Sequence, residues 1–204
     1  MLALPLTLLC APEIQEPPPQ APPPERWTTS LSTYWIEPPH GDGYLSAVLG
    51  ADRGPLHLEA HWAYEDRDTF SFFVGKSFPI TGDFAGTVTP RIGLAGGDSD
   101  GIVPAVNLEV GWKRLSFNTD VEYMIGTSNE TQDFLYSWSE LALSVNERIS
   151  VGLVAQRTNI FEQELTVDRG FLVGVNLGRT WLTAYWFNPE LDDPYFTVAF
   201  GAGF

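Results

Sequence analysis

The sequence predicts an all-β protein, a transmembrane, antiparallel, up-and-down β-barrel of about twelve strands. Hydrophobic residues alternate with small or polar ones along twelve segments between residue 27 and the C-terminus, as they do in strands whose two faces meet different surroundings. The connections alternate between a tight set and a longer, acidic set, which indicates strands that run back and forth between two ends. An even number of strands returns the chain to the end at which it began.

The N-terminal residues are predicted to lie outside the barrel. Residues 1–11 read as an atypical signal peptide, because the apolar core at 2–9 lacks a preceding Lys or Arg. The single cysteine, Cys10, lies in this leader, so no disulfide is expected. A lipidated Cys10 is the alternative, although Leu9 fits that motif poorly. Residues 12–26 contain seven prolines and predict an extended periplasmic linker that cannot pack a core.

The composition narrows the class of protein and of partner. The mean hydropathy is −0.06, and no apolar run is long enough for a transmembrane helix. A barrel escapes such a test because only every second residue meets lipid. The net charge of −15 argues against nucleic acid as a partner and against docking on anionic lipid surfaces.

The predicted strands are long enough to cross a membrane. Most have the ~9–11 residues that a tilted strand needs. The twelve segments are 27–36, 44–51, 56–64, 69–78, 85–95, 102–112, 115–125, 134–145, 149–158, 164–177, 180–188 and 195–204. The tight connections are 52–55, 79–84, 113–114, 146–148 and 178–179, and the longer ones are 37–43, 65–68, 96–101, 126–133, 159–163 and 189–194. Both ends of the barrel domain, 27–204, therefore fall on the tight-turn side.

Alternation alone does not say which face points inward. A soluble, lipocalin-like barrel has the same period with the faces reversed. The leader, the terminal aromatic residue and a concentration of aromatic residues near strand ends favour the membrane, because such aromatics mark the two membrane interfaces. These aromatics are Trp27, Trp35, Tyr64, Phe78, Trp112, Tyr123, Trp181 and Phe204.

A few positions resist this pattern. Arg169 falls on the apolar face, so either its strand projects above the membrane there or a bulge re-aims it. Pro90 and Pro104 each remove a ladder donor, which predicts local bulges or early strand ends. Segments 134–145 and 180–188 read acceptably in either phase. For the former we favour Leu141, Leu143 and Val145 outward.

The last strand carries the most specific signal. Its apolar face is Phe196, Val198, Phe200, Ala202 and Phe204, and its other face is Thr197, Ala199, Gly201 and Gly203. This strand resembles the closing strand of Gram-negative, porin-like outer-membrane β-barrels, which ends in an aromatic β-signal. The resemblance covers 27–204 at the level of fold and identifies no subfamily. It implies an outer-membrane location, and it implies that the barrel assembly machinery reads Phe196, Val198, Phe200 and Phe204.

One strand carries a His-x-Glu-x-His sequence on its predicted lumen face, at His57, Glu59 and His61. This sequence suggests a metal site. However, side chains two residues apart on a strand are separated by ~6.5–7 Å, and those four residues apart by about 13 Å. The two histidines are therefore too far apart to share an ion, and we predict a polar wall with no metal and no cofactor.

A second polar group is predicted around Arg91, the only basic residue on a mid-strand polar face. The tight turn between the next two strands pairs Asn107 with Asp120. The same register pairs Glu109 with Asn118. Such a group is either a hydrogen-bonded ladder that stiffens the wall or a constriction that selects solutes. The predicted lumen residues are His57, Glu59, His61, Arg91, Asn107, Glu109, Asp120, Glu122 and Asp168.

These residues predict a narrow, cation-preferring, porin-like channel for small hydrophilic solutes. The expected partners are outer-membrane lipid, the assembly machinery, and small solutes or cations, and the oligomeric state stays open. One alternative is a non-conducting structural or surface barrel with a filled lumen. The other is a lipid-modifying enzyme, which the absence of a His-x-Ser pair and of a nucleophile elbow disfavours. A pairing of Ser46 or Ser71 with His57 across strands is left open.

Overall fold

The computed structural model describes residues 26–64, 67–128, 131–160 and 166–204. The predicted signal peptide, and the predicted linker up to residue 25, lie outside the described residues. Among the described residues, no helix is long and apolar enough to cross a membrane.

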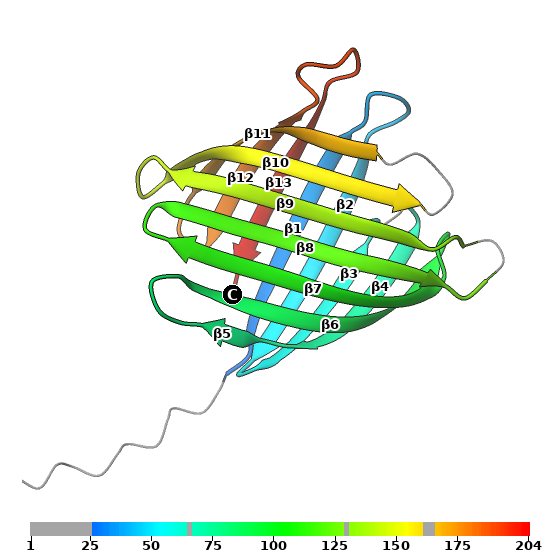
Figure 1. Ribbon diagram of the computed structural model, residues 1–204, viewed down its shortest axis with the longest axis horizontal. Helices are drawn as coiled ribbons and strands as arrows, with labels where there is room; N and C mark the ends of the chain where they lie inside the picture. The colour runs from blue at the N-terminus through cyan, green and yellow to red at the C-terminus, as the bar shows by residue number, and fades with distance from the viewer. Residues whose placement is uncertain (1–25, 65–66, 129–130, 161–165) are drawn as a thin grey trace, which may run out of the picture.

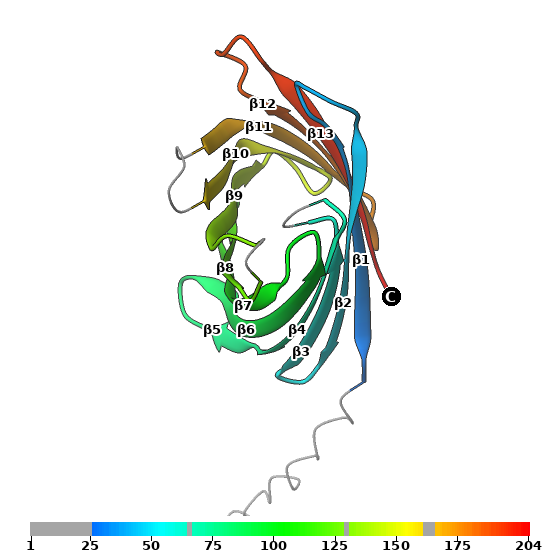
Figure 2. The same cartoon turned by 90° about the vertical axis from the view of Figure 1, so that its right-hand side faces the viewer.

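The described chain forms one antiparallel sheet that closes into a barrel (Figures 1 and 2). The strands are β1 Thr28–Glu37, β2 Tyr44–Arg53, β3 Leu56–Trp62, β4 Thr69–Lys76, β5 Phe78–Ile80, β6 Ala85–Gly97, β7 Gly101–Trp112, β8 Leu115–Gly126, β9 Phe134–Ser144, β10 Ile149–Ile160, β11 Thr166–Asn176, β12 Thr180–Phe187 and β13 Tyr195–Gly203. Strands that follow one another in sequence pair, except that β4 and β5 both pair with β6, and β1 pairs with β13. The prediction of an up-and-down barrel is confirmed, with every predicted segment within two residues of an observed one.

The strands β4 and β5 are two parts of one barrel strand, so the ring has twelve strands. Both pair with β6 in one register, which aligns Gly75 with Arg91 and Phe78 with Val88. The gap between them lies beside Pro90, which has no N–H to donate. The β7–β8 ladder likewise skips Pro104 and resumes in the same register. The ladders therefore open at both prolines without an inserted residue, so no bulge forms. The alternative prediction of an early strand end holds beside Pro90, where β4 ends at Lys76, whereas β7 continues through Pro104.

The outer wall is apolar, as the prediction requires. Leu141, Leu143 and Val145 are exposed on it, which confirms the predicted phase of 134–145. Two predicted interface aromatics lie inside instead. Ala63 has a φ of 51°, which breaks the alternation and turns Tyr64 inward against Tyr136. The second is Trp181, whose ring lies against Gly201; a Cβ at Gly201 would lie 2.2 Å from that ring.

Arg169 lies at the loop end of the outer wall. The β10–β11 register is unchanged from Ile149 to Thr158, so no bulge re-aims the side chain. The β11–β12 ladder ends at Gly170 and Phe187, and Arg169 lies one residue beyond it. The predicted bulge is therefore wrong, and a strand that reaches above the apolar band at Arg169 stays a prediction.

The two ends of the barrel meet at the tight-turn side, as predicted (Figure 1). The Phe204 N–H donates to the Thr29 carbonyl at 2.8 Å, and the Thr29 N–H donates to the Phe204 carbonyl at 3.2 Å. The apolar side chains of the last strand lie exposed on the outer wall. They are Phe196, Val198, Phe200 and Phe204.

A closed barrel has no free strand edge and resists detergent until it is heated. We therefore predict different gel mobilities for boiled and unboiled samples, together with a strand-dominated circular dichroism spectrum. A helical spectrum, or a folded protein that stays soluble without detergent, would contradict the membrane barrel.

Deleting Phe204 should impair assembly in cells more than it impairs stability. The deletion removes two backbone hydrogen bonds at the seam, and one ring contributes only about 2–3 kcal/mol when buried. We expect lower outer-membrane levels and nearly normal refolding into detergent, measured by fractionation and by gel mobility. Deleting Arg26, just before β1, serves as the control. Normal levels of the Phe204 deletion would show that the terminal ring is not an assembly signal.

Candidate functional site

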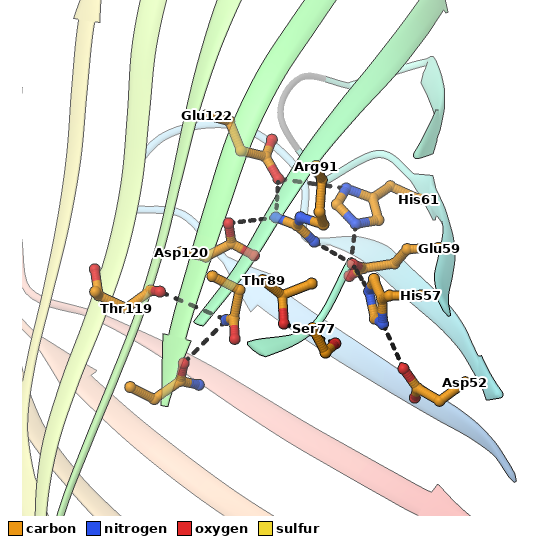
Figure 3. Close-up of polar contacts among 12 residues, drawn as sticks. Asp52, His57, Glu59, His61, Ser77, Thr89, Arg91, Thr119, Asp120 and Glu122 are labelled. Carbon is orange, nitrogen blue, oxygen red and sulfur yellow. Dashed lines mark hydrogen bonds and ion pairs between the residues drawn. The ribbon is translucent and has the colours of Figure 1, made fainter. Parts of the chain in front are cut away.

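The centre of the lumen holds a buried ionic cluster built around Arg91 of β6 (Figure 3). Only 5% of Arg91 is exposed. Its guanidinium donates to Glu59 of β3, to Asp120 of β8 at 2.5 Å and to Glu122 of β8 at 3.3 Å. A buried guanidinium is stable only when carboxylates compensate its charge. Arg91 therefore ties two distant walls of the barrel together.

The two histidines of β3 flank the carboxylate of Glu59. His57 Nε2 lies 2.8 Å from one Glu59 oxygen, and His61 Nε2 lies 2.9 Å from the other. The other nitrogen of His57 lies 2.7 Å from Asp52. Because carboxylates only accept, His57 can donate to both of its partners only when doubly protonated. The alternation of β3 brings these side chains to one face, and Glu59 links them to Arg91.

Two glycines make room for this arrangement. A Cβ at Gly75 of β4 would lie 2.7 Å from Cγ of Arg91, and a Cβ at Gly93 of β6 would lie 2.5 Å from the ring of Phe73. The Phe73 ring in turn lies under the guanidinium, 4.9 Å from its carbon. The two glycines thus leave space for the Arg91 side chain to lie across β4 and for its guanidinium to pack on the Phe73 ring.

A polar cavity of about 510 Å³ lies on the tight-turn side of this cluster; we call it the vestibule. Its wall includes Thr28 and Ser30 of β1, and Ser77 and Thr87 beside the tight turn that follows β5. Its charged lining is Asp52, Glu59, Glu109, Asp120 and Glu140, with Arg91 and His57. The vestibule therefore has five carboxylates against one arginine and one histidine.

On the loop side, aromatic rings fill the lumen. This aromatic layer consists of Tyr34, Tyr64, Phe73, Tyr136, Trp138, Tyr185, Phe187 and Tyr195. Ring contacts join it across the barrel, including Tyr34 to Trp138 at 6.0 Å and Trp138 to Phe187 at 5.5 Å. Phe73 and Phe187 are 0% exposed, so no water-filled path runs along these two side chains.

The aromatic layer is a feature that the sequence pattern did not predict. Tyr136 and Trp138 of β9, and Tyr185 and Phe187 of β12, lie two residues apart on inward faces. Both strands also carry apolar residues outward, which is why their phase was ambiguous. Aromatic residues on the face opposite an apolar outward face, such as Tyr136 and Trp138 on β9, are the signal that could have indicated a filled lumen.

The structure brings together most of the predicted lumen residues. Asn107 and Glu109 pair with Asp120 and Asn118 in the predicted register, and Asn107 Nδ2 donates to the Asn118 amide oxygen at 3.1 Å. Asp168 lies apart from the others, where it accepts from Asn188 at 2.6 Å and from Tyr195 at 3.2 Å. The other eight predicted lumen residues either form the Arg91 cluster or line the vestibule. They are His57, Glu59, His61, Arg91, Asn107, Glu109, Asp120 and Glu122.

Metal binding and serine activation are two other chemistries that the sequence suggested for these residues. In the described part of the chain, no set of three or more His, Cys, Asp or Glu side chains is placed to bind a metal. The Ser46 and Ser71 hydroxyls are buried without a hydrogen-bond partner, and both ring nitrogens of His57 face carboxylates. Neither serine is therefore activated by His57 in this structure.

Known proteins were compared with the chain by sequence and by fold. No protein-family model and no curated protein match it. The fold is similar to the KdgM porin, with a TM-score of 0.59 and 9% identity over 87% of this chain and 99% of that chain. For a KdgM porin structure in complex with disordered oligogalacturonate, the TM-score is 0.57 and the identity is 9%, over 87% of this chain and 99% of that chain. For the NanC porin, the TM-score is 0.57 and the identity is 9%, over 86% of this chain and 98% of that chain.

The fold of the chain is similar to that of solved outer-membrane porins. With its apolar outer wall, the barrel therefore has the architecture of proteins that reside in the bacterial outer membrane.

Replacing Arg91 should destabilise the barrel strongly. Arg91→Met would leave three buried carboxylates without their cation, which costs about 3–5 kcal/mol. The free energy of unfolding in detergent micelles, from urea titration, measures the loss. Arg53→Met, at the exposed end of β2, is the matched control. A loss no larger than in the control would show that the cluster does not hold the two walls together.

Proposed function

We propose that this barrel is a narrow, cation-preferring channel for small hydrophilic solutes that rests in a closed state. The vestibule and its carboxylates carry the proposal. They line a polar space inside a barrel whose fold is similar to that of porins, and rings of Asp and Glu side chains are one way in which pores select cations.

The size of the barrel makes the wall charges effective. Twelve strands at ~4.8 Å spacing and about 40° tilt give a backbone diameter of roughly 24 Å, before side chains fill it. The Debye length at physiological salt is ~8–10 Å, so the carboxylates act on an ion anywhere in the vestibule. Glu109 is exposed in the vestibule, which makes it the best placed to attract an entering cation.

The same charges argue against a polyanionic solute. One KdgM structure is in complex with oligogalacturonate, a chain of uronic acids that carries one carboxylate on each sugar. Such a solute would meet five carboxylates in the vestibule of this chain and would be repelled. The proposed solutes of the two barrels therefore differ in sign of charge.

A second candidate function is a non-conducting structural barrel, and the aromatic layer favours it. The rings pack edge to face, tilted or stacked, at 4.8 to 6.2 Å between centroids. Edge-to-face and offset-stacked pairs each add about 0.5–1.5 kcal/mol. A layer of this kind resists opening. Conduction by the wild-type protein separates the two functions.

Single-channel recording in a KCl gradient tests the channel. We expect brief, small openings of the wild type with a reversal potential that shows cation preference. Glu109→Gln combined with Asp120→Asn should weaken this preference. Glu147→Gln, in the β9–β10 turn outside the vestibule, should not. Anion preference would contradict the channel proposed here.

The same recording on Trp138→Ala tests the closure. This variant removes the central ring of the aromatic layer, so openings should become larger or longer while cation preference is kept. Trp112→Ala, on the outer wall, is the control. A silent wild type with a conducting Trp138→Ala variant would support the structural barrel, because only the damaged layer then conducts.

A further inference from the structure

A groove of about 420 Å³ lies on the outer wall, at β8 to β11 and the β12–β13 loop. Its apolar part is a row of large side chains from four adjacent strands. These are Phe117, Leu141, Leu153 and Phe171, which are partners of one another in register. The volume lies within the range of roughly 300–1,000 Å³ that ligand sites occupy.

The groove is hollow because the next row toward the loops is small. Ser139 pairs with Ala155, and Ala155 pairs with Arg169. The Ser139 hydroxyl also shares a hydrogen bond of 2.8 Å with Thr119, so it is satisfied on the wall itself. Short side chains beside a row of large ones leave space for a chain-like apolar ligand.

Two arginines stand at the loop end of this groove. Arg169 lines it, and 68% of its side chain is exposed. Arg157 is exposed on β10, and its partner Val167 lies two residues from Arg169. The two arginines are thus diagonal neighbours on one face, about 7–8 Å apart at the backbone.

Glu190 takes up only part of this positive charge. Its carboxylate lies 2.5 Å from Arg169 Nε, and this hydrogen bond lowers the pKa of Glu190. Among the described groove residues, Glu140 accepts from the lumen residues Trp138 and Tyr185. Glu190 is then the carboxylate beside the two guanidiniums, and the described loop end of the groove has a net positive charge. Arg169 bonds Glu190 through Nε, and 68% of its side chain is exposed.

This positive charge stands out on a chain of net charge −15. A charge on the lipid-facing wall costs free energy, least near the interface. Arginine also holds phosphate oxygens through two parallel hydrogen bonds. The overall negative charge disfavours docking on an anionic surface, but it does not prevent a local pair of arginines from binding one anionic headgroup.

We propose that this groove binds a single outer-leaflet lipid with a phosphorylated headgroup. An acyl chain lies along Leu153 and Phe171, and Arg157 and Arg169 hold the phosphate. The site lies on the outer wall, so it is independent of the channel. The loop end is the outer end because the tight turns of such barrels face the periplasm.

Lipid binding to the purified, detergent-solubilised barrel tests the proposal. The probes are phosphatidic acid and diacylglycerol with the same acyl chains, measured by native mass spectrometry. The wild type should retain phosphatidic acid at least tenfold better. Arg157→Gln with Arg169→Gln should reduce this preference roughly 10- to 30-fold, since each arginine contributes about a factor of five near a membrane surface. Arg148→Gln with Arg179→Gln, at the tight-turn end, is the matched control.

A second pair of variants tests the groove without changing charge. Leu153→Trp should fill the groove and reduce binding of both lipids, whereas Val151→Trp, one step away on the same strand face, should not. Unchanged binding in Leu153→Trp, or equal losses in the two arginine pairs, would overturn the proposal. So would inorganic phosphate that displaces phosphatidic acid at equal concentration, because the acyl chain would then contribute nothing.

Discussion

Closure of the sheet is the constraint on which the rest of this structure depends. A strand edge has unpaired N–H and C=O groups, which lipid cannot satisfy. The pairing of β1 with β13 and of β4 with β6 removes both edges. Once the ring is closed, every second side chain must point into a space of limited width. Each inward residue then needs either a polar partner, a packed neighbour or water, and the lumen contains regions of all three kinds.

The interior is consequently divided along the barrel axis. On the tight-turn side the vestibule holds serines, threonines and carboxylates, which water can solvate. In the middle, the Arg91 guanidinium donates to the carboxylates of Glu59, Asp120 and Glu122. On the loop side, rings such as Phe187 pack as they would in the core of a soluble protein. The Arg91 cluster and the aromatic layer meet where the Phe73 ring lies against the guanidinium. A substitution in one of them should therefore alter the packing of the other.

The outer wall is also more than a uniform apolar band. Small side chains at Ser139 and Ala155 create a depression between large ones, and Arg169 places positive charge at its loop end. The inner and outer walls are built from the same strands, because successive residues point to opposite faces. Glu140 and Leu141 of β9 are adjacent in sequence, yet Glu140 accepts hydrogen bonds from the lumen residues Trp138 and Tyr185 while Leu141 faces lipid.

The sequence by itself determined the strands, the even ring, the two kinds of connection and the register that pairs Asn107 with Asp120, because alternation and turn residues act locally. It also placed His57, Glu59 and Arg91 on inward faces. Only the tertiary structure decided what fills the lumen. Tyr64 turned inward because of the backbone at Ala63, and Trp138 found its partners on β1 and β12, far away in sequence. Contacts across a barrel join strands that are not neighbours, and no local pattern encodes them.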